Sequence, residues 1–222
     1  MMKISLVVLN LVVILGFSVP ASAAAITNGS FEADGNFSGT CFVGGGATGW
    51  SGGFEICGAG YYGAATPPDG NNFFIIGGGT DCPTCNPLSQ NISGLTSGLS
   101  YTVTFYLTAE GFHTPGVAEQ VAVSMASGSS TDSQNFMAPA VPSGNSIWSS
   151  WAQFNYTFQA NSTNATIQFH QTGPLGSDDA AIDKVSIAQQ GGTVPEPGTL
   201  SLLGIGLASV GWAALRKKRS AS

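Results

Sequence analysis

Positive charge is what this sequence lacks most. The 222-residue chain has six Lys and Arg residues against twelve Asp and Glu residues. Between residues 24 and 190, Lys184 is the only basic residue among eleven acidic ones, which leaves a charge near −10. Binding to nucleic acid or to an anionic membrane surface needs Lys and Arg to neutralise phosphate. We therefore expect no nucleic-acid partner, and neutral glycans or cations such as Ca²⁺ instead.

Helical periodicity is missing from the same central region. No segment there places apolar residues at i, i+3, i+4 and i+7 over the length of a helix. Residues 101–108 instead alternate, with Tyr101, Val103, Phe105 and Leu107 on one face and threonines on the other. Further strand-like segments are 73–76, 121–125, 154–158, 167–169 and 182–187. Short strands between clusters of Gly, Ser, Asn and Pro predict an all-β fold, an antiparallel β-sandwich.

Catalytic patterns are also scarce. The two histidines are His113, in a stretch with Gly and Pro, and His170, on the polar face of its strand. A nucleophilic triad needs a histidine between a nucleophile and an acid, and glycoside hydrolysis needs two carboxylates across a cleft. Neither arrangement is visible in the sequence. We expect no catalytic residues and no enzyme, with a glycoside-acting enzyme as the less favoured alternative.

The N-terminus has the features of an export signal. Lys3 precedes an apolar stretch over residues 4–17, and Ala21-Ser22-Ala23 follows it. A charged start, an apolar centre and an Ala-x-Ala site are typical of a secretory signal peptide. We therefore predict a signal peptide over residues 1–23, cleaved after Ala23.

The C-terminus combines a linker, an apolar run and a basic tail. Residues 191–198 contain Pro195-Glu196-Pro197, and an apolar segment follows over residues 199–215. At about 1.5 Å per residue that segment spans roughly 25 Å, which predicts a transmembrane helix. The tail, residues 216–222, begins with Arg216, Lys217, Lys218 and Arg219. Basic residues stay on the cytoplasmic side, so the central domain would lie outside the inner membrane.

This C-terminal order of parts resembles the PEP-CTERM sorting signal of Gram-negative bacteria that make extracellular polysaccharide. The resemblance rests on Pro195-Glu196-Pro197, the apolar segment and the basic block of residues 216–219. It implies an exosortase, a membrane-embedded protease or transpeptidase, as a partner. The protein would be held in the inner membrane by its C-terminal helix and then sorted to the envelope or extracellular matrix. A permanent C-terminal anchor is the alternative interpretation.

Four cysteines lie in the first half of the central domain: Cys41, Cys57, Cys82 and Cys85. An even number in an exported domain predicts disulfides, with three connectivities open. We favour Cys41–Cys57 and Cys82–Cys85. The Cys-x-x-Cys spacing would also suit half a zinc site or a redox motif. Zinc would need two further ligands at a compatible spacing, and a redox motif would need a βαβ setting.

The central domain, residues 24–190, resembles the galactose-binding-like jelly rolls found in many PEP-CTERM and cell-wall proteins. It is also similar to several carbohydrate-binding modules. The segments that carry this resemblance are 28–32, 49–50, 54–56, 69–73, 88–92, 98–105, 151–160 and 181–187. The resemblance implies a jelly roll and association with extracellular polysaccharide. The cysteine-bearing stretches 41–60 and 82–85 depart from the family, so its ligand site does not transfer directly.

A metal site is the sharpest chemical prediction. Asp183 shares its parity with the apolar Val185, so we expect its carboxylate on the core side of the last strand, where it needs a partner. Glu32 could meet it if the terminal strands are adjacent, and two carboxylates with backbone carbonyls suit Ca²⁺. The resemblance to jelly rolls also implies a structural Ca²⁺ there. Alternatively, Asp183 caps a loop and Glu32 is solvated. We interpret Asp178-Asp179 as a solvated turn.

Aromatic residues in loops are the candidates for glycan contact. Tyr61, Tyr62 and Trp148 lie in stretches rich in Gly, Ser and Asn, where a rigid sandwich would present them to a ligand. The resemblance to the jelly-roll family implies that Trp50 and Trp151 belong to the core. The alternative is a structural coat or biofilm-matrix protein with no discrete ligand site. Six Asn-x-Ser/Thr sequons would suit a glycosylated coat protein.

Overall fold

The structure is a computed structural model that describes residues 23–44, 46–64, 66–77, 84–112, 116–142, 147–173 and 178–191. Within these residues, no helix is long and apolar enough to cross a bilayer. The signal peptide predicted over residues 1–23 lies almost wholly outside the described part, as does the helix predicted over residues 199–215. Both remain predictions from the sequence.

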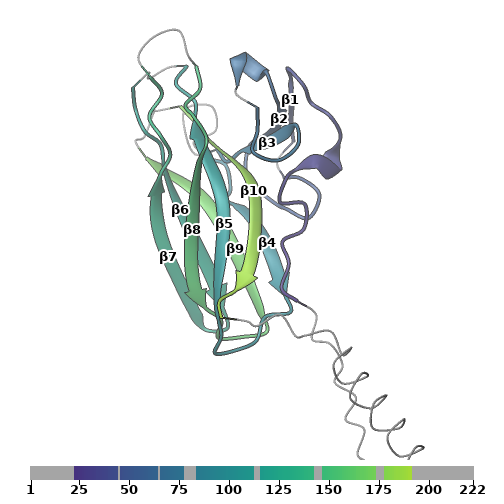
Figure 1. Cartoon of the computed structure of the whole chain (residues 1–222), viewed down its shortest axis with the longest axis vertical. Helices are drawn as coiled ribbons and strands as arrows, with labels where there is room; N and C mark the ends of the chain where they lie inside the picture. Colours follow the sequence, from purple (N-terminus) through teal and green to yellow (C-terminus); the bar gives the residue numbers. More distant parts are fainter. Residues whose placement is uncertain are drawn as a thin grey trace, which may run out of the picture.

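The described residues form two antiparallel sheets (Figure 1). The six-stranded sheet has the order β1 (Cys41–Val43), β2 (Glu55–Gly58), β3 (Asn72–Ile75), β10 (Ala180–Gln189), β5 (Ser100–Ala109), β8 (Ala152–Gln159). The four-stranded sheet has the order β4 (Leu88–Ser93), β9 (Asn164–Gly173), β6 (Gln120–Ser127), β7 (Ser130–Met137). Two 3₁₀ turns, η1 (Glu32–Asp34) and η2 (Tyr61–Gly63), complete the described elements. The predicted all-β jelly-roll sandwich is confirmed.

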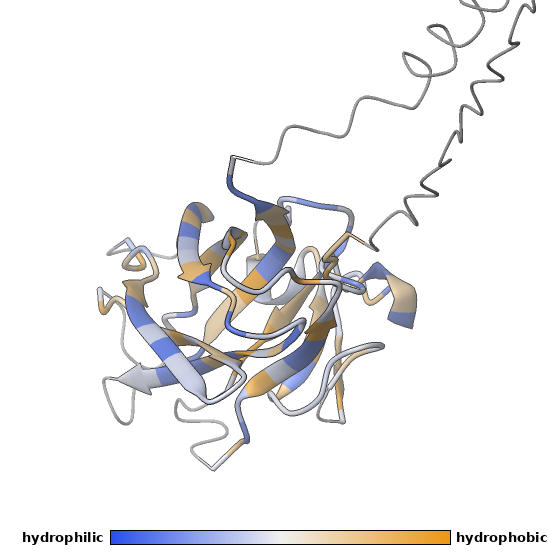
Figure 2. Ribbon diagram, turned by 90° about the horizontal axis from the view of Figure 1, so that it is seen from below, coloured by the Kyte–Doolittle hydropathy of each residue, from blue (hydrophilic) through white to orange (hydrophobic). Residues whose placement is uncertain are grey.

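The core lies between the two sheets and is built from the inward faces of alternating strands. Figure 2 shows this alternation as bands of orange and blue along the ribbons. In β5 the four residues predicted to face inward are buried, and so is Thr108, which was predicted on the opposite face. Phe105 joins the sheets, because its ring lies 5.2 Å from Phe136 of β7 and 5.2 Å from Phe169 of β9. Burial of such rings is the main source of stability in a sandwich.

A bulge interrupts β10 and changes which side of the sheet its residues face. Asp183 pairs with Tyr106 of β5, whereas Ser186 already pairs with Thr104, so β10 contains one extra residue. Lys184 takes up this residue with a φ of 52°. Asp183 therefore lies on the face opposite its core-facing neighbour Ile182. The predicted core-side position of Asp183 is wrong, because parity with Val185 does not hold across a bulge.

The N-terminal insert, which we define as residues 41–63, contains β1, β2 and η2. Cys41 and Cys57 are direct partners in its β1–β2 ladder and form a disulfide, as predicted. Cys85 is also disulfide-bonded. Its predicted partner, Cys82, lies outside the described residues. The insert thus extends the six-stranded sheet by two short strands that a covalent bond holds together.

Candidate functional site

Asp183 is a fully buried acidic residue at the bulge of β10. Its side chain is 0% exposed. The backbone N–H of Asp69 donates to its Oδ2 over 2.9 Å, and the N–H of Lys184 donates to its Oδ1 over 2.6 Å. The loop before β3 therefore covers the bulge of β10 and supplies one of two hydrogen bonds to this carboxylate.

Glu32 is held beside the same loop. Its Oε1 accepts the backbone N–H groups of Asn71, over 2.7 Å, and Asn72, over 2.5 Å. Gly70 makes this approach possible, since a Cβ at that position would lie 2.5 Å from Glu32 Oε1. Gly70 also has a φ of +75°, which favours glycine. The sequence prediction paired Glu32 with Asp183, and the structure places both against one segment, residues 69–72.

The charges around Asp183, in the cluster that it forms with Glu32 and Asp69, disfavour the ionised form of its carboxyl group. The pKa of Asp183 is raised from 3.8 to about 8, first by burial and then by the negative charges of Asp69 and Glu32, against the lowering effect of the two backbone hydrogen bonds. Lys184 is the only Lys or Arg in the described part of the chain, and its Nζ lies 5.7 Å from the centre of the Tyr106 ring. A bound cation would neutralise the negative charge of these carboxylates.

Asp183, Glu32 and Asp69 offer carboxylate oxygens, the ligand type that Ca²⁺ prefers. Their oxygens do not all lie within 4.8 Å of one another in the described structure. A tighter set of potential ligand atoms, all within 4.8 Å of one another, belongs to Cys41, Glu55 and Cys57. The two sulfurs of that set are joined in the disulfide, so it is not a thiolate metal site. Any Ca²⁺ at the carboxylates of Asp183, Glu32 and Asp69 would need these side chains to move closer together.

A second candidate site is the aromatic corner, which we define as Tyr61, Tyr62 and Phe112. The Tyr61 and Tyr62 ring centres lie 4.5 Å apart, and the Tyr62 and Phe112 rings are stacked at 5.8 Å with 26° between their planes. Tyr62 is 55% exposed and Phe112 is 56% exposed. The corner thus presents the rings of Tyr62 and Phe112 to solvent, and the Tyr62 ring also contacts the less exposed ring of Tyr61. Phe112 was not predicted as a contact residue, because its only signal in the sequence is an aromatic side chain next to Gly111.

The backbone of η2 is built to present its tyrosines. Tyr62 has a φ of 43° and a ψ of 35°, a left-handed conformation that is costly for a bulky residue. Gly60 and Gly63 flank the pair with φ of +84° and +77°, and a Cβ at either would meet nothing within 4 Å. These glycines serve the turn rather than the packing. The tight turn holds both side chains at the end of the insert.

Acidic residues lie behind the aromatic corner. Glu55 and Glu110 are 6% and 5% exposed. Burial raises the pKa of the Tyr61 hydroxyl, and the charge of Glu55, the neighbouring Tyr62 and the charge of Glu110 raise it further. Tyr61 therefore stays a neutral hydrogen-bonding hydroxyl at physiological pH. The corner combines apolar ring faces with carboxylates, and lacks any described basic group.

Trp148, predicted to be available for glycan contact, is buried instead. It is 5% exposed and packs edge-on against Phe73, with ring centres 5.3 Å apart. Together with Trp151, whose ring lies 5.8 Å from Phe73, it forms a small cluster on the outer side of the six-stranded sheet. Trp50 is 7% exposed in the main core, as expected. The prediction for Trp148 is wrong because its polar neighbours in sequence do not reveal the Phe73 side chain that covers it.

Asp178-Asp179 is not a solvated turn. The two residues are 2% and 1% exposed. The Asp178 carbonyl accepts the Gln171 Nε2–H over 2.6 Å, and the Asp179 carbonyl accepts the Glu110 N–H over 2.9 Å. This pair is therefore part of the packed entry to β10. His170 lies partly exposed on β9, and His113 lies outside the described residues.

Comparison with known proteins places the chain in a family. Residues 24–188 match a family described as "Protein of unknown function (DUF642)". The chain belongs to the DUF642 family. Residues 193–219 match the PEP-CTERM protein-sorting motif, as the sequence analysis predicted. This motif indicates a secreted protein that an exosortase processes at the membrane. A comparison with the curated proteins found no match.

Three solved structures similar to the DUF642 chain have low sequence identity to it. A cyclase from Fischerella sp. TAU is 17% identical, with 74% of this chain and 96% of that chain covered and a TM-score of 0.52. TmCBM61 in complex with β-1,4-galactotriose is 17% identical, with 73% and 96% covered and a TM-score of 0.40. The EclA C-terminal domain, a sugar-binding protein, is 18% identical, with 45% of this chain covered and a TM-score of 0.35. The chain spans 64% of that structure's length.

Proposed function

We propose that the exported domain binds neutral extracellular polysaccharide without catalysis, through the aromatic corner of Tyr61, Tyr62 and Phe112. Sugars stack their apolar faces on aromatic rings and hydrogen-bond through their hydroxyls. The corner offers two exposed rings, with Glu55 and Glu110 behind them. The observation that carries the proposal is the conformation of Tyr62, an exposed and bulky residue held in a left-handed turn.

The charge of the domain selects the class of glycan. Acidic side chains outnumber basic ones by eleven to one between residues 24 and 190. A polysaccharide rich in uronic acids would be repelled, and the repulsion would weaken with added salt. A neutral polysaccharide has no such penalty. We therefore propose neutral galactans, glucans or xylans rather than acidic polymers as the ligands.

Binding of the secreted protein to a panel of soluble neutral polysaccharides tests this function. Replacing both exposed rings, in Tyr62→Ala with Phe112→Ala, should weaken binding at this site at least tenfold in affinity electrophoresis. The matched control is Phe42→Ala, which removes an equally exposed ring (60%) elsewhere in the insert. Equal binding by both variants and the wild type would contradict the proposed site. No binding by the wild-type protein would favour a coat protein with no discrete ligand site.

We also propose that Ca²⁺ binds at Asp183, Glu32 and Asp69 as a structural ion. A cation would complete a cluster in which a fully buried carboxylate faces two other negative charges. Binding to the folded state alone raises the melting temperature by mass action. Asp183→Ala should abolish the rise that Ca²⁺ produces, and the exposed Asp132→Ala should keep it. A melting temperature insensitive to both Ca²⁺ and chelator would remove the site.

The sorting route beyond the motif itself is a further proposal. We propose that the full-length chain is first held in the inner membrane by residues 199–215 and is then cut near Pro195-Glu196-Pro197. Replacing Pro195 and Pro197 by Ala should leave full-length protein in the inner-membrane fraction. Immunoblots of membrane and medium fractions would show this. Unchanged release into the medium would contradict the route.

A further inference from the structure

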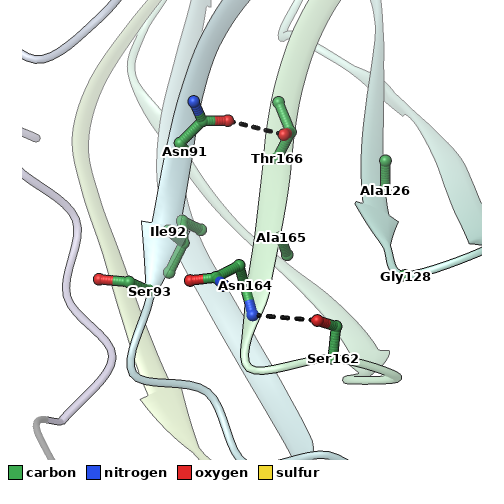
Figure 3. A pocket seen from close by; sticks show the side chains of 9 residues that line it. All are labelled: Asn91, Ile92, Ser93, Ala126, Gly128, Ser162, Asn164, Ala165 and Thr166. Carbon is green, nitrogen blue, oxygen red and sulfur yellow. Dashed lines mark hydrogen bonds between the residues drawn. The ribbon is translucent and has the colours of Figure 1, made fainter.

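Two adjoining hollows run along the outer face of the four-stranded sheet. The larger, about 620 Å³, lies over the ends of β4 and β9 (Figure 3). The smaller, about 300 Å³, is lined by Gly49–Ser51 and by residues 89–91 of β4. Asn91 lines both. We call the two hollows together the β4 groove.

The β4 groove is lined by neutral hydrogen-bonding side chains. The amide and hydroxyl groups along it include those of Ser51, Ser89, Asn91, Ser93, Asn164 and Thr166. No acidic or basic side chain lines either hollow, although the domain as a whole is acidic. The one aromatic residue on its wall, Trp50, is only 7% exposed. Such a surface suits a ligand that is itself uncharged and rich in hydroxyl groups.

Cross-strand contacts orient these groups before any ligand binds. Thr166 Oγ1 donates to Asn91 Oδ1 over 2.7 Å, which fixes the direction of the Asn91 amide. Figure 3 shows the Asn91 nitrogen turned away from Thr166. The hydroxyls of Ser51 and Ser89 lie 3.1 Å apart at the other end of the groove. A preoriented donor in the middle of the groove lowers the entropy cost of binding.

We propose that the β4 groove is a second polysaccharide site and that the domain bridges two neutral chains. From Ser89 to Ser93 the groove follows roughly 13 Å of strand, long enough for a short stretch of extended glycan. In Figure 1 the end of β4 lies low on the sandwich, whereas η2 lies at the top of the insert. One chain in the groove and another on the aromatic corner would not compete. The bridging role rests on the proposed function, but the groove does not.

A peptide strand or a second copy of the protein is the competing occupant, because β4 is an edge strand of its sheet. The shape favours a glycan. The larger hollow is lined by β4, by β9 and by the turn residues Gly128 and Ser162, so it lies over the sheet face rather than along the β4 backbone. It also offers no deep apolar pocket to receive the side chains of a peptide.

Light scattering from mixtures of the secreted protein and a soluble neutral polysaccharide, such as β-1,4-galactan, tests the bridging. The wild-type protein should increase the scattering, because two sites per molecule join chains. Asn91→Arg places a long charged side chain in the groove and should return the scattering to that of the polysaccharide alone. Ser124→Arg carries the same charge on β6 of this sheet, outside both hollows, and should scatter like the wild type.

Binding measurements on the two sets of variants distinguish the groove from the aromatic corner. In affinity electrophoresis, Asn91→Arg should still bind through the aromatic corner, and Tyr62→Ala with Phe112→Ala should still bind through the groove. Loss of all binding in the aromatic variant would overturn the groove and leave the proposed function standing. Loss of all binding in Asn91→Arg would support the groove and overturn the aromatic site. If Asn91→Arg increases the scattering as much as the wild type does, the groove is not a polysaccharide site. The same conclusion follows if sedimentation of the protein alone shows that the wild type self-associates and Asn91→Arg does not, because lost self-association would then explain the lost scattering.

Discussion

The sandwich and the N-terminal insert differ in how far they expose their aromatic residues. In the sandwich, Phe105 and Phe169 are 0% exposed and their rings touch across the two sheets. In the insert, Phe42 is 60% exposed and Tyr62 is 55% exposed. Buried rings stabilise the sandwich, whereas the insert buries Trp50 but exposes Phe42 and Tyr62 and adds a disulfide and glycine-rich turns. The difference teaches that one insert can both join the core and present rings to solvent.

The largest expected effect is in the sandwich. Phe105→Ala should lower the free energy of unfolding by about 3–5 kcal/mol, because it removes a ring that contacts Phe136 and Phe169 and leaves a cavity. Denaturant unfolding followed by tryptophan fluorescence measures this. Phe42→Ala, at an exposed position, should change stability by less than about 0.5 kcal/mol. Similar losses in the two variants would break the comparison.

Removing the disulfide should have the next largest effect, and it should be confined to the insert. With Cys41→Ala and Cys57→Ala, the insert should lose about 2–4 kcal/mol of local stability, since the bond closes a short loop. Hydrogen exchange measured by mass spectrometry should show faster exchange in β1 and β2. Exchange in β5 and β9 should stay within error of the wild type. Uniformly faster exchange would show that the insert and the sandwich unfold together.

The cluster at Asp183, where the sandwich meets the loop before β3, should respond to pH. The pKa of Asp183 is raised to about 8 in the folded state, so folding favours its protonated form. In protein kept in chelator, its contribution to stability should be present below about pH 4. It should then fall as the pH rises toward 8, by at most about 1.4 kcal/mol per pH unit.

Melting temperatures between pH 4 and 9 measure this effect, with Asp183→Asn as the matched control. The control should lack this part of the pH dependence, since Asn does not titrate. Ca²⁺ should remove most of the fall in the wild type, so its stabilising effect should grow with pH. Identical pH profiles for the wild type and the control in chelator would show that Asp183 does not titrate in this range.

The smallest expected effect separates stability from binding most directly. Tyr62→Gly removes a bulky residue from a left-handed conformation that glycine adopts readily, so the stability of the insert should be unchanged or rise by up to about 1 kcal/mol. Polysaccharide binding at the aromatic corner should weaken in the same variant. Thermal unfolding and affinity electrophoresis measure the two quantities. A clear loss of stability would show that Tyr62 belongs to the packing rather than to the binding surface.

Much of the sandwich was predictable because its strands alternate. The segment 101–108 shows its inward and outward faces in sequence, and the structure has them so except at the buried Thr108. β7 gave no such signal, because seven of its eight residues are exposed at the edge of a sheet. The bulge at Lys184 could not be predicted either, since one extra residue in a strand does not change the composition of the segment. Alternation thus predicts strands that have one buried face, and it misses edges and irregularities.

The candidate sites were predicted less well, because loops from distant parts of the chain cover or expose them. Tyr62 was found from its glycine-rich surroundings, and its exposure agrees with that signal. Trp148 has similar surroundings, yet Phe73 of β3 packs against it. Asp178 and Asp179 are buried, and their carbonyls accept hydrogen bonds from Gln171 and Glu110. No pattern in the neighbouring sequence predicts these contacts. Burial by tertiary contact is therefore the part that the sequence did not reveal.

The position of Lys184 has a consequence for survival outside the cell. Trypsin-like proteases cut after Lys and Arg, and Lys184 is the only such residue between positions 24 and 190. It lies within β10, in the centre of the six-stranded sheet, with its side chain folded over Tyr106. A protease must bind its target as an extended and unpaired segment, which this strand offers only after the sandwich opens. The folded domain should therefore persist among enzymes that digest proteins richer in lysine and arginine.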